Sequence, residues 1–287
     1  MWEAFIKHAC NGTFMHTRTF LERTNDYEDA SVLIYKDRLL IAVLPASKEN
    51  NVIYSHNKAT FGGLVYNNNT RGNDIVDIFK ELKQYYNLPI IYRAVPKEFH
   101  KIELSDDIWA LHTLKAERIA CELSPHIKKQ SLFNYTTTTL ENYSINRINR
   151  LDYSILDVWK NIVIPNYAKL DLIPVHSGKD IGDLYRLFPN NIDGYYLSYK
   201  NKMISALVLF EFNNCAHVQY SASNSKGRAL KGLDMLHRYY IKHILKANKI
   251  YNFGKCTEQN GNVLNEGLYN YKNKFNTGSL VYESYEY

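Results

Sequence analysis

The sequence has few cysteines, and none of them is placed for metal binding. Cys10, Cys121, Cys215 and Cys256 stand far apart, and no CxxC pair or other metal-ligand spacing occurs. We therefore expect thiols that are buried or incidental in a reducing compartment, and no metal centre.

The sequence also lacks a long hydrophobic run. The longest apolar stretch, residues 203–212, is about half of what a membrane-spanning helix needs. Residues 1–8 do not show a charged region followed by an apolar one, which is the pattern of a secretory signal. These features predict a cytoplasmic protein without a transmembrane segment.

A dense block of one charge is missing as well. The net charge is +6, from 35 Lys and Arg against 29 Asp and Glu, but the basic residues are spread along the chain. Such a charge suits small anionic ligands and permits an RNA partner without indicating one. It gives no reason to expect DNA binding.

Apolar and aromatic residues, in contrast, are plentiful. They make up 45% and 14% of the 287 residues, which is enough for one large core or two ordinary ones. A globular protein follows.

An internal repeat indicates two domains. Residues 34–44 and 198–208 both predict a β-hairpin with a tight polar turn, Lys-Asp-Arg in the first and Lys-Asn-Lys in the second. Placed 164 positions apart, the two segments share three identical residues: Tyr35 with Tyr199, Lys36 with Lys200, and Ala42 with Ala206. Because unrelated hairpins share turn residues, the repeat counts only if the flanking elements repeat too.

The flanking elements do repeat. After each hairpin we expect a strand, a loop, an amphipathic helix, a strand, a helix and a closing strand. In the first half they are expected at 52–55, 60–63, 73–86, 90–92, 105–116 and 118–123. In the second half they are expected at 216–222, 225–227, 229–247, 250–253, 262–275 and 279–285. Helices are also expected before the hairpins, at 2–8 and near Phe20, and at 155–167 and 179–187.

This order predicts an α/β (α+β) protein in which each half has a mixed sheet with helices on its faces. The segment 131–149 is rich in Thr, Asn and Ser and lacks periodicity, so it is expected to connect the halves. The predicted domains are 1–135 and 136–287.

The element order resembles the fold of the GNAT acyltransferases, and two such units in tandem resemble the FemABX-like transferases. Short motifs add to the likeness with FemAB-like proteins of bacterial surface-polysaccharide loci. They are Gly-Thr-Phe at 12–14, Asp29, Ser-His at 55–56, Thr-Phe-Gly-Gly at 60–63, Phe-Gly-Lys-Cys-Thr-Glu at 253–258, Leu-Asn-Glu-Gly-Leu at 264–268 and Tyr-Lys-Asn-Lys-Phe at 271–275. The likeness covers nearly the whole chain.

The resemblance implies an acyl-CoA donor, most simply acetyl-CoA, whose pyrophosphate binds backbone N–H groups before a helix of the second half. The family pattern Arg/Gln-x-x-Gly-x-Gly/Ala is matched in part by six residues: Asn224, Ser225, Lys226, Gly227, Arg228 and Ala229. Asn replaces the usual Arg or Gln, one glycine is kept, and Lys226 and Arg228 are expected to supply charge. The alternative is a polar loop that caps the helix through Ser225.

In the first half, the resemblance implies an acceptor groove. Its candidate residues are His56, Thr60, Gly62 and Gly63. An imidazole titrates near neutral pH, so His56 could exchange a proton with the acceptor. The alternatives are a hydrogen-bonded structural histidine and glycines required by the backbone alone.

Acyl transfer to an amine needs a base, a polarised carbonyl and a proton for the leaving group. Glu258, just after a predicted strand, is the candidate base, and its alternative is a surface loop residue. Tyr220 and Tyr269 are candidate acids, and Tyr269 is also placed at the acceptor. The resemblance implies that Lys272 meets phosphate or developing negative charge. At most one of Lys272 and Lys274 is expected to face a cleft, since they lie about 200° apart on a helix.

Three functions remain open. The first is an N-acyltransferase that moves an acyl group from acyl-CoA to an amine of a small or lipid-linked acceptor, such as an amino sugar or cell-envelope precursor. The second uses aminoacyl-tRNA to extend a cell-wall peptide, as FemABX-type proteins do, although no long charged helical hairpin is visible. The third is a GNAT-like pair that binds without catalysis.

Overall fold

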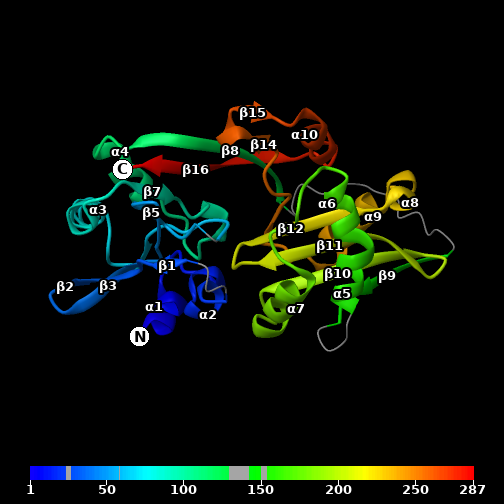
Figure 1. Cartoon of the computed structure of the whole chain (residues 1–287), viewed down its shortest axis with the longest axis horizontal. Coiled ribbons are helices and arrows are strands. Elements are labelled where there is room, and N and C mark those ends of the chain that lie inside the picture. The colour runs from blue at the N-terminus through cyan, green and yellow to red at the C-terminus, as the bar shows by residue number, and fades with distance from the viewer. Residues whose placement is uncertain (24–26, 58, 129–141, 150–153) are drawn as a thin grey trace. The chain divides into compact units, whose positions relative to one another are not determined.

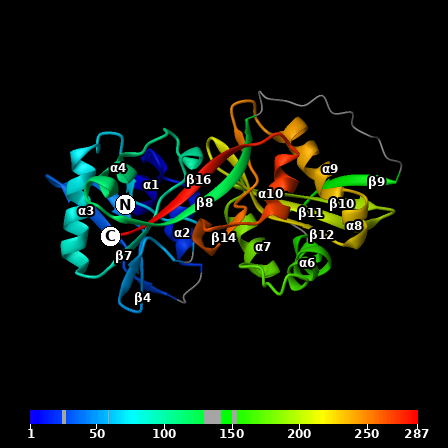
Figure 2. The same ribbon diagram turned by 90° about the horizontal axis from the view of Figure 1, so that it is seen from above.

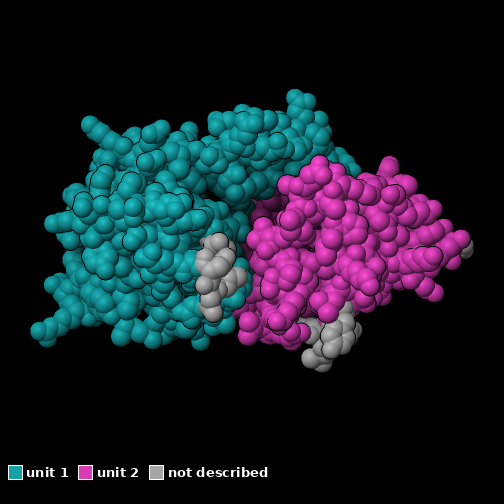
Figure 3. Space-filling model, in the orientation of Figure 1, with its two compact units in different colours: residues 1–125, 255–287 teal, residues 126–254 magenta. Residues whose placement is uncertain are grey.

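The computed structural model describes residues 1–23, 27–57, 59–128, 142–149 and 154–287. Two compact units are formed (Figure 3): unit 1 combines Met1–Pro125 with Lys255–Tyr287, and unit 2 is His126–Gly254. The predicted domains, 1–135 and 136–287, follow the repeat. The compact units differ from them because the last segment of the chain packs in unit 1.

Unit 1 has one sheet in the order β1-β4-β5-β7-β16-β8 and a second in the order β2-β3-β6 (Figure 1). Its strands are β1 (Glu28–Asp29), β2 (Val32–Lys36), β3 (Leu39–Leu44), β4 (Ser47–Glu49), β5 (Val52–Tyr54), β6 (Val65–Tyr66), β7 (Ile90–Arg93), β8 (Glu117–Lys128), β14 (Thr257–Glu258), β15 (Val263–Leu264) and β16 (Gly278–Glu286). Its α-helices are α1 (Trp2–His8), α2 (Arg18–Leu21), α3 (Asn73–Tyr86), α4 (Asp106–Thr113) and α10 (Glu266–Asn273).

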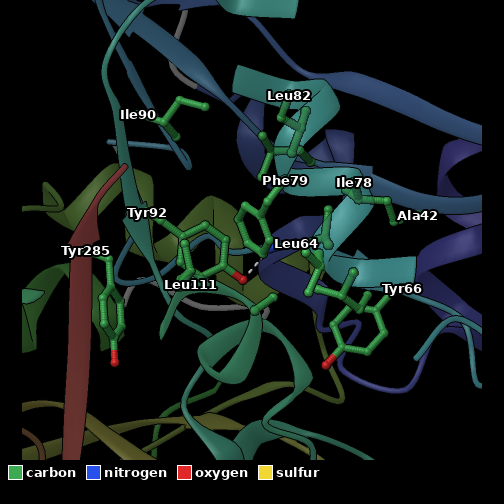
Figure 4. Packing of buried hydrophobic residues seen from close by; sticks show 14 of the residues in the cluster. Ala42, Leu64, Tyr66, Ile78, Phe79, Leu82, Ile90, Tyr92, Leu111 and Tyr285 are labelled. Carbon is green, nitrogen blue, oxygen red and sulfur yellow. Dashed lines mark hydrogen bonds between the residues drawn. The ribbon is translucent and has the colours of Figure 1, made fainter. Parts of the chain in front are cut away.

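The core of unit 1 forms where helix α3 meets strand β7. The predicted helical spacing is confirmed, since Ile75, Ile78, Phe79 and Leu82 are all buried. The ring of Phe79 packs edge-on against Tyr92 at 5.2 Å (Figure 4). The Tyr92 hydroxyl accepts a bond from the Leu64 amide and donates one to Asp107. The Tyr92 hydroxyl is therefore satisfied, whereas the buried Tyr66 hydroxyl of the same cluster has no hydrogen-bond partner among the described residues.

Unit 2 has a mixed sheet in the order β13-β12-β11-β10-β9, in which β12 and β13 are parallel and the other described pairs are antiparallel. Its strands are β9 (Tyr143–Arg147), β10 (Ile192–Tyr199), β11 (Lys202–Glu211), β12 (Cys215–Ser223) and β13 (Ile250–Asn252). Its helices are α5 (Ser154–Val158), π-helical turn η4 (Trp159–Val163), α6 (Ile164–Ala168), α7 (Gly178–Leu187), α8 (Ser225–Ala229), α9 (Gly232–Tyr239) and π-helical turn η5 (Tyr240–Ile244). Helices α6 and α7 lie on one side of the sheet and α9 on the other (Figure 2).

The repeated hairpins are confirmed, but the residue matching is wrong by one position. Both turns have two residues with positive φ, at 37–38 in β2/β3 and at 200–201 in β10/β11. In both hairpins the register shifts two residues before the turn, between Ile34 and Tyr35 and between Leu197 and Ser198. The structural offset is therefore 163, so Lys36 corresponds to Tyr199. A slip of one residue moves a side chain to the other face of a strand.

The closing strands of the two copies do not stay within their own copies. Strand β8, which ends the first copy, pairs through residues 126–128 with β13 in unit 2. Strand β16, which ends the second copy, lies between β7 and β8 in unit 1 (Figures 1 and 2). This exchange explains why residues 255–287 belong to unit 1.

Three predicted elements differ in detail. The helix expected at 229–247 is divided, because Lys231 takes a left-handed conformation with φ of 53° between α8 and α9. It continues through η5 and ends at Ile244. The helix expected at 262–275 is α10, shortened at its start by strand β15. The connection expected at 131–149 contains strand β9, and its remainder up to residue 141 lies outside the described residues.

Candidate active site

In unit 2, the parallel strands β12 and β13 separate soon after they meet. They pair only over Cys215–His217 with Ile250–Asn252, whereas β12 pairs with β11 through to Ser223. The β11/β12 register also shifts at Val208/Leu209, which leaves Gln219 as a bulge in β12. Beyond His217, one edge of β12 is therefore not covered by β13.

Polar groups stand where the two strands part. The Asn252 side-chain oxygen accepts a bond from the Gly254 amide at 2.7 Å and one from His217 Nδ1 at 3.2 Å. His217 must carry its proton on Nδ1 to donate here. His126 on β8 pairs opposite Asn252, so three polar residues form a row across the sheet. Gly254 allows the chain to leave the strand with φ of +76°.

Tyr220 lies on the same face as His217, since their partners on β11, Val208 and Phe210, are two residues apart. The Tyr220 hydroxyl accepts a bond from the His176 amide at 3.1 Å and lies 2.7 Å from His176 Nδ1, to which it can donate. Both residues are buried. The predicted acid is thus part of a tyrosine–histidine pair, and His176 was not expected from the sequence.

The predicted donor loop is a capped helix start. Asn224, not Ser225 as expected, is the N-cap of α8, and its side-chain oxygen accepts a bond from the Gly227 amide at 2.9 Å. A Cβ at Gly227 would lie 2.0 Å from the Ile204 carbonyl oxygen. Glycine is therefore required here by close packing on β11.

The two basic side chains of this loop contact the protein itself. The Lys226 ammonium lies 5.3 Å from the centre of the Tyr199 ring, a cation–π distance. Arg228 donates to the Ser223 carbonyl at 2.7 Å and to Ser225 Oγ at 3.4 Å. A phosphate that binds the Gly227 amide would have to displace the Asn224 cap.

Comparisons with solved structures identify the fold. FemX aligns over 98% of this chain and 94% of its own, with a TM-score of 0.66 and 10% identity. L-PGS from Bacillus licheniformis aligns over 99% and 89%, with a TM-score of 0.63 and 11% identity. The fold is FemABX/GNAT-like. The C-terminal domain of a putative lysylphosphatidylglycerol synthetase from Agrobacterium fabrum also aligns, over 89% and 83%, with a TM-score of 0.59 and 8% identity.

No family model and no curated protein matches the sequence. At such low identities, the structural matches establish the FemABX/GNAT-like fold and leave activity and substrates to the site itself. Among the described residues, no three His, Cys, Asp or Glu side chains gather as metal ligands. None of the described helices has both the length and the apolar character needed to cross a bilayer.

The remaining catalytic candidates, Glu258 and Lys272, lie in unit 1, apart in sequence and unit from Tyr220 and the loop at 224–229. Glu258 is exposed on β14 and accepts a bond from the Asn265 side chain at 2.7 Å. Glu258 is thus a surface residue, as in the alternative, but it lies in a short strand and not in a loop. Tyr269 is half-buried on α10.

Lys272 is buried, with 6% of its surface exposed, and donates to the Lys255 carbonyl at 2.6 Å. Lys274 is exposed and lies over the Tyr271 ring at 4.1 Å, so the two lysines face different directions as expected. Burial lowers the pKa of Lys272 to about 8. Near neutral pH, this position of the FemABX/GNAT-like fold therefore carries a positive charge that is easily lost.

The lowered pKa predicts a pH-dependent stability. Between about pH 8 and the ordinary lysine pKa of about 10.5, the folded protein has lost the Lys272 proton while the unfolded chain keeps it. The contribution of Lys272 to stability should therefore rise with pH in this range, by up to about 3 kcal/mol. The free energy of unfolding of the wild type in urea, relative to that of Lys272→Met, should increase between pH 7.5 and pH 10. The same pH dependence in both proteins would show that Lys272 does not have this shift.

The acceptor residues predicted in the first half of the chain form one loop, residues 55–63, in which residue 58 is outside the described residues. Arg93 holds this loop by donating to the carbonyls of Ala59 at 2.8 Å and Thr60 at 2.7 Å. Gly63 has φ of +80°. This left-handed conformation favours glycine at position 63, so the alternative that the backbone alone requires glycine applies to Gly63, independently of any ligand.

His56 is the unusual member of this loop. It is 1% exposed, has φ of +64°, and within the described part of the chain neither of its ring nitrogens has a hydrogen-bond partner. Its ring packs against Tyr27 at 4.8 Å. The expectation that His56 titrates near neutral pH is wrong, because burial lowers its pKa to about 4. A buried polar ring without a hydrogen-bond partner is costly.

Burial also lowers the pKa values of His16 and His100 to about 4. Between pH 6.5 and 4 the imidazoles of His16, His56 and His100 bind protons in the unfolded chain but stay neutral in the folded protein. The free energy of unfolding should therefore fall as the pH falls. Each histidine contributes up to about 3 kcal/mol to this loss of stability. Urea midpoints at pH 7 and pH 4.5 should differ less in His56→Gln than in the wild type. Identical pH dependence would show that His56 does not have this shift.

Proposed function

We propose that this protein transfers an acyl group to an amine, with the donor carbonyl held in unit 2 where β12 and β13 separate. The supporting observation is the row of His217, Asn252 and His126 at that point of a FemABX/GNAT-like fold. Ligands of open α/β sheets bind at such carboxyl ends of strands. The proposed acceptor is an amino sugar or a cell-envelope precursor, small or lipid-linked.

The reaction needs one proton removed and one supplied. The acceptor nitrogen attacks the donor carbonyl carbon, a C–N bond forms, and the C–S bond of a thioester or the C–O bond of an ester breaks. The nitrogen loses a proton and the leaving sulfur or oxygen gains one. Tyr220 is the proposed acid, which gives its hydroxyl proton to the leaving group. The proton released by the acceptor nitrogen returns to the Tyr220 oxygen, with His176 Nδ1, 2.7 Å away, as the relay.

Two donors fit the proposal. Acyl-CoA is the donor that the residues at 224–229 suggest. Aminoacyl-tRNA is favoured by one observation, since Asn224 already caps the Gly227 amide that a coenzyme A pyrophosphate would use. Titration with acetyl-CoA separates them. Micromolar binding that weakens about tenfold in Lys226→Ala, but not in the exposed control Lys242→Ala, supports acyl-CoA.

Absence of acetyl-CoA binding, combined with amide formation from aminoacyl-tRNA, would support the second donor. Absence of both would contradict an enzymatic role and favour a binding module. Substitution at Gly227 is unsuitable for this test because its close contact with Ile204 would disturb the fold.

Tyr220→Phe should lower kcat by about 100-fold, as expected for loss of a general acid, while KM stays nearly unchanged. Tyr269→Phe, which changes a half-buried tyrosine of α10, is the matched comparison. A loss of kcat in Tyr269→Phe alone would move the acid to α10. Equal activity in all three proteins would exclude both tyrosines.

A further inference from the structure

Unit 2 contains a pocket of about 250 Å³ away from the strand separation. It lies beside Lys249, which immediately precedes β13, whereas Asn252 ends that strand. The charged groups and the hydroxyl that line it are Arg147, Asp193, Glu211, Tyr240, Lys246 and Lys249. None of these residues belongs to the candidate active site.

The basic side chains of this pocket have bonding capacity left. Arg147 donates through Nε to Asp193 at 2.8 Å, and its side chain is 57% exposed. Within the described residues, its two Nη groups have no hydrogen-bond partner, and neither has the exposed ammonium of Lys246. Lys249 donates to Glu211 at 2.5 Å and to the Phe212 carbonyl at 2.6 Å.

The acidic side chains, in contrast, are used by the protein. Asp193 accepts bonds from Arg147, from the Tyr195 hydroxyl at 2.8 Å and from the Gly194 amide at 3.0 Å. Glu211 accepts bonds from Lys249 and from the Tyr240 hydroxyl. Both carboxylates are mostly buried, with 10% and 18% of their side chains exposed. A ligand in the pocket therefore meets N–H donors more readily than acceptors.

We propose that this pocket binds a phosphate group. The paired N–H groups of a guanidinium match two phosphate oxygens, and a lysine ammonium adds a point charge. With three cations against two carboxylates, the pocket has a net positive charge that favours an anion. The phosphate is either free or part of a phospholipid headgroup, since both present the same oxygens to Arg147 and Lys246.

Titration of the full chain with inorganic phosphate, followed by amide NMR, tests the proposal. We expect saturable shifts for residues 189–193 and 244–249, and a dissociation constant raised about fivefold in Lys246→Gln. Lys242→Gln, which removes an exposed charge of η5 that does not line the pocket, should bind like the wild type. Arg147→Lys keeps the positive charge but loses the paired N–H groups of the guanidinium, so it should also weaken binding.

Co-sedimentation with phosphatidylglycerol vesicles, with phosphatidylcholine vesicles as reference, identifies the source. Binding to these vesicles that is lost in Lys246→Gln assigns a lipid headgroup, and binding of inorganic phosphate alone assigns a free phosphate. No saturable binding in either experiment, or binding that is unchanged in both Lys246→Gln and Arg147→Lys, would overturn the proposal. Thermal unfolding of each variant identifies any that fails to fold, and Lys246→Gln, an exposed substitution, should fold normally.

Discussion

Deletion of residues 278–287 should unfold unit 1 and leave unit 2 largely intact. Strand β16 lies between β7 and β8, so its loss leaves one edge of each of these strands without hydrogen bonds. It also removes the buried rings of Tyr282 and Tyr285, each worth about 3 to 5 kcal/mol. Together these losses are comparable with the whole stability of a domain, about 5 to 15 kcal/mol. Hydrogen exchange measured by peptide should show lost protection in residues 1–125.

Val281→Thr is the control for this deletion. It changes a side chain of β16 that is 47% exposed and keeps a β-branched residue in the strand, so protection should remain as in the wild type. Retained protection of residues 1–125 in the deletion would show that β7 and β8 hold together without β16. Equal loss in both units would show that they unfold as one.

Gly62→Ala should destabilise the protein by about 3 kcal/mol or more. A Cβ at this position would lie 1.4 Å from the Ser55 carbonyl oxygen, a distance that no packing allows. The neighbouring backbone cannot move freely, because the Gly62 carbonyl binds His16 Nε2 at 2.8 Å and Ser55 Oγ accepts the Arg93 amide at 2.7 Å. Urea unfolding of the purified variant measures the loss.

Gly267→Ala provides the matched control. Gly267 lies in α10, its nearest neighbour to an added Cβ is 3.8 Å away, and alanine is a better helix former by about 0.8 to 1.0 kcal/mol. This variant should be as stable as the wild type or more so. Similar losses at both glycines would show that the contact with Ser55 does not determine the cost at Gly62.

Much of the fold is predictable because the spacing of apolar residues along the sequence indicates its helices and strands. Helix α3 was expected with the bounds it has, since four apolar residues recur on one face. The hairpins were found by their turns, but the matching slipped by one residue because Tyr35 and Tyr199 are identical without being equivalent. The exchange of β8 and β16 was not predictable, since strand pairing over such distances leaves no local pattern.

The site was less predictable than the fold. Tyr220 was named from its strand, but its partner His176 lies 44 residues away in sequence, and only the fold brings the two together. The sequence pattern predicts that Asn224 binds phosphate, whereas in the structure its side-chain oxygen caps helix α8 by accepting a bond from the Gly227 amide. His56 and Lys272 were named for their place in motifs. Their lowered pKa values come from burial, which a single sequence does not reveal.

The exchanged strand also imposes an order on synthesis. All of unit 2 leaves the ribosome before β16 does. The sheet of unit 1 therefore stays incomplete until the last residues emerge. During that interval the edges of β7 and β8 that β16 later covers are open to any passing strand. When synthesis is stalled before residue 278, chaperones should therefore bind the N-terminal segment, Met1–Pro125, and not the more recently synthesised unit 2.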